Sequence, residues 1–252
     1  MKLKFTALVM IIFSALTYAS GQKAPTSAES APVAKLPTIG EILAKYVTAI
    51  GGREANAKIK SRESKGTVEL TPMGIKGSFV SIGAPDARSV TRMNLAGIGV
   101  LADGNDGTTA WSDNPIQGGR LKAGKELQQM LILSNFYREI NLDKLYANLK
   151  VNGAASVDGK DVFIVEASNE GLPIEKFYFD SKTGYLLRTD STIVSPEGDQ
   201  PAVIHYEDFR EVDGVKLPFR VRTKLPQFEI VVITTDIKHN IKLDEATFAR
   251  PK

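Results

Sequence analysis

The segment from residue 205 to residue 221 constrains the fold most, because its pattern is typical of two long strands joined by a tight turn at Asp213-Gly214. An Asp-Gly pair suits the positive φ angles of a type I′ hairpin turn, whose twist matches that of the flanking strands. Similar turns are expected at 106–107 and 158–159, each between runs rich in β-branched or aromatic residues. We therefore expect a series of antiparallel hairpins.

The first 21 residues predict export from the cytoplasm. Lys2 and Lys4 form a positively charged start, an apolar run covers residues 5–18, and the small residues that follow allow cleavage after Ala19 or Gly21. The alternative is a membrane anchor, but the apolar run is shorter than the ~20 residues that cross a bilayer. We expect a cleaved signal peptide, a periplasmic protein and no transmembrane segment in the mature chain.

Composition excludes several classes of protein. The chain has no cysteine, so disulfides, thiolate metal sites and a lipid-modified cysteine are ruled out. About 230 residues remain after the predicted signal peptide, which is enough to bury a core without cross-links. Two of the 32 basic residues lie in that peptide, so the remaining 30 are balanced by 29 acidic residues without any basic patch. A nucleic-acid partner is therefore not expected.

Residues 22–37 consist mostly of Ala, Pro, Ser and Lys, and we expect them to form a flexible leader before a single domain at 38–252. Thr38 and Glu41 have the spacing of a capping box, which predicts the start of a helix. Its apolar positions recur at helical spacing, and a glycine pair at 51–52 ends it. Those positions are Ile39, Ile42, Leu43, Tyr46, Val47 and Ile50. A second short helix is expected at 53–59.

The rest of the pattern is mainly β, with two further helices expected at 124–138 and 142–148. So many strands would curl if left open, so we predict a curved antiparallel sheet, a half-barrel of about 11–12 strands capped by a few helices. The expected strands are 61–70, 75–83, 88–95, 100–103, 108–112, 149–157, 161–168, 174–180, 185–195, 201–213, 217–224 and 228–239.

Alternation in the late strands predicts one apolar face. Phe177 and Phe179 share a face with Glu175, and Tyr206 shares one with Asp208. The apolar residues on such faces must line an interior, which is either filled or hollow. The candidate ligand-binding residues are Val68, Leu70, Phe79, Trp111, Leu127, Met130, Leu131, Phe136, Phe177, Phe179, Ile204, Tyr206, Ile230 and Val232.

The predicted helix at 124–138 is apolar around more of its circumference than a surface helix needs. It either fills the core permanently or acts as the movable cover of a cavity. Ala123 gives it no side-chain N-cap, and Gly118-Gly119 just before it would let the backbone swing. The sequence alone leaves both interpretations open.

No pattern in the chain indicates a catalytic or metal site. The segment 96–100 lacks the third glycine of a dinucleotide-binding fingerprint, and 103–107 resembles the start of a calcium loop but has Asn114 where that loop requires glutamate. His205 and His239 are far apart in sequence, and no Gly-x-Ser-x-Gly nucleophile elbow accompanies them. We therefore expect no enzyme, no metal and no cofactor.

Several segments together resemble the outer-membrane lipoprotein-sorting proteins, the LolA-like family. The resemblance extends from about Thr38 to Pro251 and is carried by Pro37–Gly52, Ser61–Leu70, Asp106–Pro115 and the hairpin at 205–221. It implies a helix-capped half-barrel with an apolar cavity for the acyl chains of lipids or lipoproteins crossing the periplasm. No functional position of that family is transferred to a residue of this chain.

Three functions from different classes fit these observations. The first is a periplasmic carrier of lipid or lipoprotein acyl chains. The second is a periplasmic sensor or scaffold of the same fold that binds and regulates an envelope membrane protein. The third, a hydrolase, needs a convergent polar cluster that the sequence does not show.

Overall fold

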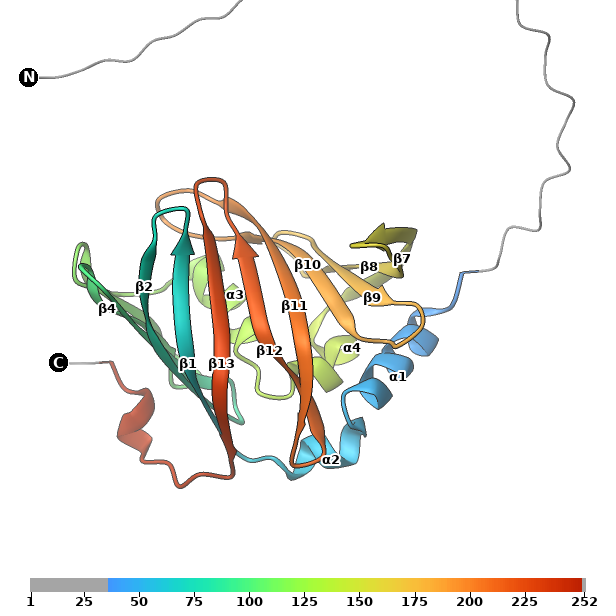
Figure 1. Ribbon diagram of the computed structural model, residues 1–252, viewed down its shortest axis with the longest axis horizontal. Coiled ribbons are helices and arrows are strands. Elements are labelled where there is room, and N and C mark those ends of the chain that lie inside the picture. The colour runs from blue at the N-terminus through green and yellow to red at the C-terminus, as the bar shows by residue number, and fades with distance from the viewer. Residues whose placement is uncertain (1–35, 251–252) are drawn as a thin grey trace, which may run out of the picture. The chain divides into compact units, whose positions relative to one another are not determined.

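The computed structural model describes residues 36–250, which belong to one compact unit (Figure 1). The predicted signal peptide and the leader up to residue 35 lie outside the described residues. The strands are β1 (Arg62–Thr71), β2 (Ile75–Ala84), β3 (Arg88–Leu95), β4 (Gly99–Asn105), β5 (Ala110–Asn114), β6 (Gly118–Leu121), β7 (Asn148–Val157), β8 (Lys160–Ser168), β9 (Glu175–Asp180), β10 (Leu186–Ile193), β11 (Gln200–Val212), β12 (Val215–Lys224) and β13 (Glu229–His239). The helices are α1 (Ile39–Ala49), α2 (Gly52–Lys58), α3 (Gly124–Leu133), α4 (Leu142–Leu145), and the 3₁₀ turns η1 (Arg138–Ile140) and η2 (Glu245–Phe248).

All the strands of this unit form one antiparallel sheet of 13 strands. Its order is β6-β5-β4-β3-β2-β1-β13-β12-β11-β10-β9-β8-β7, so the pairing of β1 with β13 joins an early series of hairpins to a late one. The sheet is curved, and its edge strands β6 and β7 do not pair with each other, so it stays open (Figure 1). The predicted half-barrel with few helices is confirmed. The short glycine-rich β6 is the strand that the sequence pattern missed.

Two of the three expected Asp-Gly turns have type I′ geometry. Both central residues have positive φ angles at Asp213-Gly214 (51° and 79°) and at 158–159 (49° and 76°). The expectation for 106–107 is wrong, because there only Gly107 has a positive φ. The Asp106 carboxylate instead accepts from the backbone N–H groups of residues 108 and 109, at 2.9 and 2.7 Å, and closes a wider loop.

Helix α1 begins as predicted. The Thr38 hydroxyl and the Glu41 carboxylate form a capping box, and Ile42, Leu43, Tyr46 and Val47 make the buried face. The corner between α1 and α2 lies against the β11–β12 turn, where a Cβ on Gly51 would come within 2.2 Å of the Gly214 carbonyl oxygen. Gly51 is therefore required at this contact.

The predicted helix at 124–138 is too long, because α3 already ends at Leu133. The Ser134 hydroxyl donates to the Met130 carbonyl oxygen at 2.6 Å, and the Asn135 side chain accepts from the backbone N–H of Tyr137 at 3.1 Å. Side chains of these types compete with the helical backbone hydrogen bonds. The chain then continues through η1 and the short α4, which ends at Leu145 instead of residue 148.

Strand β11 is irregular at Asp208. Glu207 pairs with Arg220 and Phe209 with Pro218 in one unbroken register, but Asp208 between them has a φ of +54°. Pro218 has no N–H for a regular ladder at this point. Tyr206 and Phe209 both line the cavity described below, whereas Asp208, which we expected beside Tyr206, is absent from that lining and pairs with Arg210. Phe177 and Glu175, by contrast, point the same way, as predicted.

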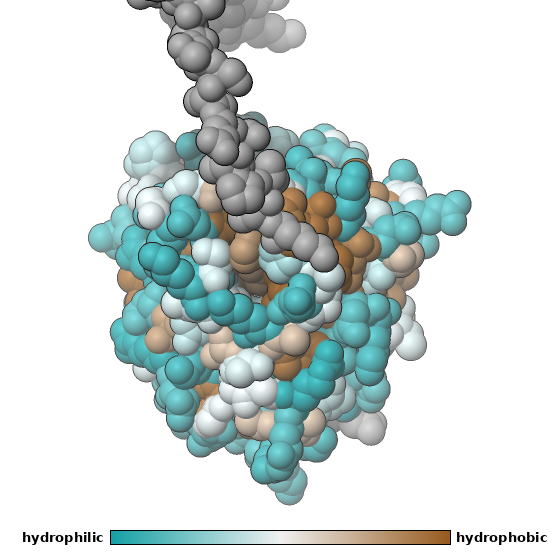
Figure 2. Space-filling model, turned by 90° about the vertical axis from the view of Figure 1, so that its right-hand side faces the viewer, coloured by the Kyte–Doolittle hydropathy of each residue, from teal (hydrophilic) through white to brown (hydrophobic). Residues whose placement is uncertain are grey.

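The concave face of the sheet carries two packed clusters. One joins α1 to Phe177, Phe179 and Val165. The other joins Val68 and Leu70 of β1 to apolar residues of the neighbouring strands. In the view of Figure 2, hydrophilic side chains cover most of the visible surface and hydrophobic residues show between them. Among residues 36–250, no helix is long and apolar enough to span a lipid bilayer.

Candidate ligand cavity

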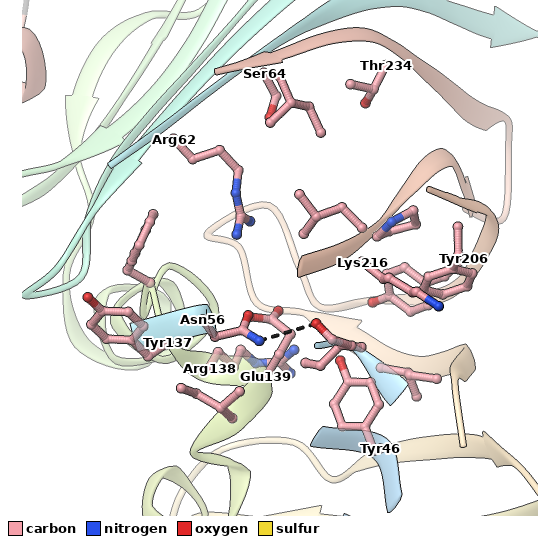
Figure 3. Close-up of a pocket in the computed structure, with 18 residues that line it drawn as sticks. Tyr46, Asn56, Arg62, Ser64, Tyr137, Arg138, Glu139, Tyr206, Lys216 and Thr234 are labelled. Atoms are coloured by element: carbon pink, nitrogen blue, oxygen red, sulfur yellow. Dashed lines mark hydrogen bonds between the residues drawn. The ribbon is translucent and has the colours of Figure 1, made fainter. Parts of the chain in front are cut away.

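A cavity of about 230 Å³ lies on the concave face, between the α1–α2 corner, strands β1 and β11 to β13, and the segment 136–140 (Figure 3). Its lining mixes apolar, polar and charged side chains. The apolar ones are Ile50, Phe136, Ile140, Leu186, Phe209, Leu217, Pro218 and Ile237, and the others are Tyr46, Asn56, Arg62, Ser64, Tyr137, Arg138, Glu139, Tyr206, Lys216 and Thr234. The cavity is therefore amphipathic.

Arg62 reaches from the start of β1 into the middle of the cavity (Figure 3). Its Nε donates to Nε2 of His239 at 3.2 Å, and its guanidinium lies 5.5 Å from the centre of the Phe136 ring. Within residues 36–250, its two Nη atoms have no hydrogen-bond partner and no carboxylate within ion-pair distance. Burial lowers the pKa of this guanidinium, and the nearby Glu139 charge opposes that effect. Arg62 thus remains a cation with free donors.

His239 fixes the position of Arg62. Its Nδ1 lies 2.9 Å from the Asp213 carboxylate, and its side chain is 1% exposed. Because the Arg62 Nε can only donate, His239 Nε2 must accept and Nδ1 must carry the proton. Burial lowers the pKa of His239; the Asp213 carboxylate raises it, and the Arg62 charge lowers it. The imidazole is therefore neutral at pH 7 and holds Arg62 in one orientation.

Arg138 forms the floor of the cavity and belongs to a buried polar cluster. Its Nη2 donates to the Tyr146 hydroxyl at 2.7 Å and lies 3.3 Å from the Glu175 carboxylate, to which Tyr146 also donates. Burial disfavours the Arg138 charge, but the neighbouring Tyr146 and Glu175 raise its pKa. The Nε atom of Arg138 is buried without a partner. This arginine, unlike Arg62, is neutralised by a carboxylate.

The segment 136–140 closes one side of the cavity. Phe136 lies over Gly83, where a Cβ would come within 3.3 Å of the ring. The Tyr137 hydroxyl donates to the Ile59 carbonyl oxygen at 2.9 Å, and the Arg53 guanidinium donates to the carbonyl oxygen of Ile140. A few hydrogen bonds thus hold this wall against the α2 region.

Helix α3, just before this segment, connects the two limbs of the sheet (Figure 1). At its C-terminal end, the fully buried Asn105 of β4 donates to Ser134 at 2.9 Å. The Gln129 side chain donates to the Thr192 carbonyl oxygen of β10 at 2.7 Å and accepts from the Val194 N–H at 2.9 Å. Six strands separate β4 from β10 in the sheet. The helix therefore spans the open side of the half-barrel.

The N-terminus of α3 has no side-chain cap, as the sequence indicated. In the first turn, the Glu126 carboxylate accepts two hydrogen bonds from Arg120 at 2.7 Å and one from Lys122 at 3.0 Å, which ties the helix start to the β6 region without capping its backbone. Glu126 is also the only residue of this helix that is buried, with 9% of its surface exposed. Gly118 and Gly119, which we expected to act as a hinge, begin strand β6 and pair with β5.

Of the candidate ligand-binding residues, Phe136 and Tyr206 line the cavity. Phe177 and Phe179 are 0% and 1% exposed in the cluster under α1, and Val68, Leu70, Ile230 and Val232 pack together in the second cluster. Phe79 is buried opposite Gly66, and Ile204 is half-buried on the Tyr206 face. Leu127, Met130 and Leu131 are half-buried on α3 without lining this cavity. Much of the expected interior is therefore filled.

Trp111 lies on the other face of the sheet. Its ring covers Gly104, and its Nε1 donates to the Phe248 carbonyl oxygen at 3.0 Å. Trp111 therefore holds the C-terminal segment against the sheet and does not line the cavity.

The charged lining residues were missed by the sequence analysis. Arg62 shares the period-two positions of Val68 and Leu70 on β1, so alternation alone could have placed it on the same face. No comparable signal exists for Arg138 or Lys216, because they reach the cavity from other elements. Their positions depend on the tertiary fold.

No protein-family model matches the chain, and no curated protein matches its sequence. Solved structures do match its fold. A LolA superfamily protein from Nitrosomonas europaea aligns with a TM-score of 0.56 at 13% identity, covering 85% of this chain and 99% of that one. A DUF1329 family protein from Desulfovibrio piger aligns with a TM-score of 0.56 at 15% identity, covering 84% and 97%.

A domain described as an outer membrane lipoprotein-sorting protein, from Vibrio parahaemolyticus, aligns with a TM-score of 0.51 at 13% identity, covering 82% of this chain and 94% of its own. These likenesses span nearly the whole of each solved chain. The protein therefore has the open half-barrel fold of the LolA superfamily, and the resemblance seen in the sequence is confirmed at the level of the fold.

Proposed function

We propose that this protein is an exported carrier that holds an acyl chain of a lipid or lipoprotein inside the half-barrel, in the periplasm. The observation that carries the proposal is the cavity on the concave face, with its apolar residues and its wall at 136–140. A dry cavity of ~150 Å³ is enough to bind benzene. A volume of about 230 Å³ therefore has room for part of one acyl chain.

The size also limits the cargo. Pockets for drug-sized ligands occupy ~300–1,000 Å³, so a complete multi-chain lipid does not fit the cavity as it stands. Either the cargo places a single chain in it, or the wall at 136–140 moves outward. The lipoprotein-sorting description of the Vibrio parahaemolyticus domain, which has the same fold, supports a carrier role. The predicted signal peptide supports export to the periplasm.

We propose binding and not catalysis, because both histidines are engaged in other contacts. His205 lies 3.7 Å from the Asp158 carboxylate, and His239 lies between Arg62 and Asp213. Among residues 36–250, neither hydrogen-bonds to a serine or threonine, and no group of three or more His, Asp or Glu side chains is placed to hold a metal. Neither histidine is therefore placed to activate a serine or threonine among the described residues.

Native mass spectrometry tests the proposal. Protein purified from the periplasm without detergent should carry acyl-containing molecules, and the delipidated protein should bind one fluorescent fatty-acid analogue per chain. Ser64→Phe, which fills the cavity from β1, should abolish binding. Thr67→Phe, an exposed position on the opposite face of the same strand, should leave binding unchanged. Absence of both bound lipid and probe binding in the wild type would contradict the carrier function.

A further inference from the structure

The cavity has more positive than negative charge. Arg62, Arg138 and Lys216 line it, and Glu139 is the acidic side chain in that lining. The ammonium of Lys216 has no hydrogen-bond partner or ion pair among the described residues, like the Nη atoms of Arg62. Free donors from β1 and β12 thus meet in one space.

A purely apolar ligand does not explain this arrangement. A cation removed from water is unfavourable unless a counter-charge or hydrogen-bond acceptors compensate it. Arg138 forms an ion pair with the Glu175 carboxylate, but Arg62 has no carboxylate partner. At the same time, His239 and the Phe136 ring hold the Arg62 guanidinium in a defined orientation. The Arg62 guanidinium is therefore held in place while its two Nη atoms stay free, as expected of a preorganised binding group without its ligand.

We propose that the cavity takes a single-chain amphiphile with an anionic headgroup, and that Arg62 holds this headgroup. The guanidinium fork matches the two oxygens of a carboxylate or phosphate. Lys216 contributes a second unpaired positive charge, whereas the charge of Arg138 is already compensated by Glu175. The acyl chain then lies against the apolar lining residues, among them Phe209 and Leu217. This inference rests on the proposed carrier function and names the class of its cargo.

Calorimetric titration of the delipidated protein with three ligands of equal chain length tests it: decanoate, decyl phosphate and decanol. An anion held by charge-assisted hydrogen bonds should bind at least about tenfold more tightly than the alcohol. Whichever of decanoate and decyl phosphate binds more tightly identifies the headgroup. Arg62→Gln should remove most of the preference for anions and leave decanol affinity within about twofold. Arg62→Lys keeps the positive charge but loses the planar guanidinium, so it should retain part of the preference for anions.

Arg92→Gln is the matched control, since Arg92 lies in the same sheet on the opposite face and should not affect any of the three affinities. Equal affinity of the wild type for all three ligands, unchanged by Arg62→Gln, would overturn the inference and leave the carrier function intact. If the wild type binds none of the three ligands, both the inference and the proposed carrier function are wrong. If Arg62→Gln does not fold, the wild-type comparison and Arg62→Lys still decide the question.

Discussion

The packed cluster under α1 and the cavity beside it lie on the same concave face, but the arginine of each has a different electrostatic environment. In the cluster, Arg138 is paired with Glu175 and lies 5.3 Å from the centre of the Phe177 ring. In the cavity, Arg62 has no carboxylate partner and lies beside open space. The first arrangement contributes to a specific core. The second leaves donors available, which favours binding over stability.

Replacing Phe179 by Ala should have the largest effect on stability and sharpens this comparison. Its ring packs 5.1 Å from the Tyr46 ring and 6.2 Å from the Phe177 ring, and its side chain leaves a cavity when truncated. We expect a loss of ~3–5 kcal/mol in the free energy of unfolding. Leu217→Ala, in the cavity wall, should cost less than ~2 kcal/mol, because fewer packing contacts disappear. Urea denaturation of both variants measures the difference.

The result for Phe179 also decides between a filled and a hollow interior at this position. If Phe179→Ala costs no more than Leu217→Ala, the region under α1 is loosely packed, and the contrast between cluster and cavity is lost.

The stability of the protein should depend strongly on the carboxylate partner of Arg138 and only weakly on Arg62 itself. Glu175→Gln leaves the buried Arg138 charge uncompensated, so we expect a loss of about 3 kcal/mol. Arg62→Gln removes a cation that has no counter-charge, so stability should stay within ~1 kcal/mol of the wild type or rise. Denaturant melts at pH 7 test both variants. A loss of several kcal/mol for Arg62→Gln would show that Arg62 is a structural residue.

The pH dependence of stability should report the His239 contact. The folded protein lowers the pKa of His239, so below its unfolded pKa of ~6.5 the unfolded chain binds more protons and stability falls as pH falls. Protonation also removes the acceptor for Arg62 Nε and brings two cations together. His239→Gln, whose amide oxygen can accept the same hydrogen bond, should lose less stability between pH 7 and pH 5. Equal losses would exclude a role for His239.

The sequence predicts the strands better than the cavity, for reasons that particular residues show. Period-two alternation located nearly every strand because that signal is local. Tyr206 and Phe209 both line the cavity next to the positive φ of Asp208, and period-two alternation does not anticipate such an irregularity inside a strand. The early end of α3 followed from Ser134 and Asn135, whose side chains compete with the helix. The cavity itself needs α1, β1, β12 and η1 to meet in space.

The smallest expected effect concerns the mobility of the cavity wall. Helix α3 has no N-cap hydrogen bond, and its apolar residues Leu127, Met130 and Leu131 are only half-buried. Apart from Ile132, which packs against the cluster under α1, its attachments to the sheet are polar contacts, which open at lower free energy than a packed core. The amide groups of α3 and of the segment 136–140 should therefore exchange faster with deuterium than those of β1 and β13.

Hydrogen exchange with and without decanoate tests whether this wall is the movable cover. Bound ligand should slow exchange in α3 and in 136–140 and leave the β7–β8 hairpin unchanged, because those strands lie outside the cavity lining. Gln129→Ala removes the two hydrogen bonds to the β10 end and should speed exchange in α3 further, whereas Gln128→Ala, an exposed neighbour, should not. If α3 is protected as strongly as β1 and ligand has no effect, the helix is a fixed part of the core and cargo must enter by another route.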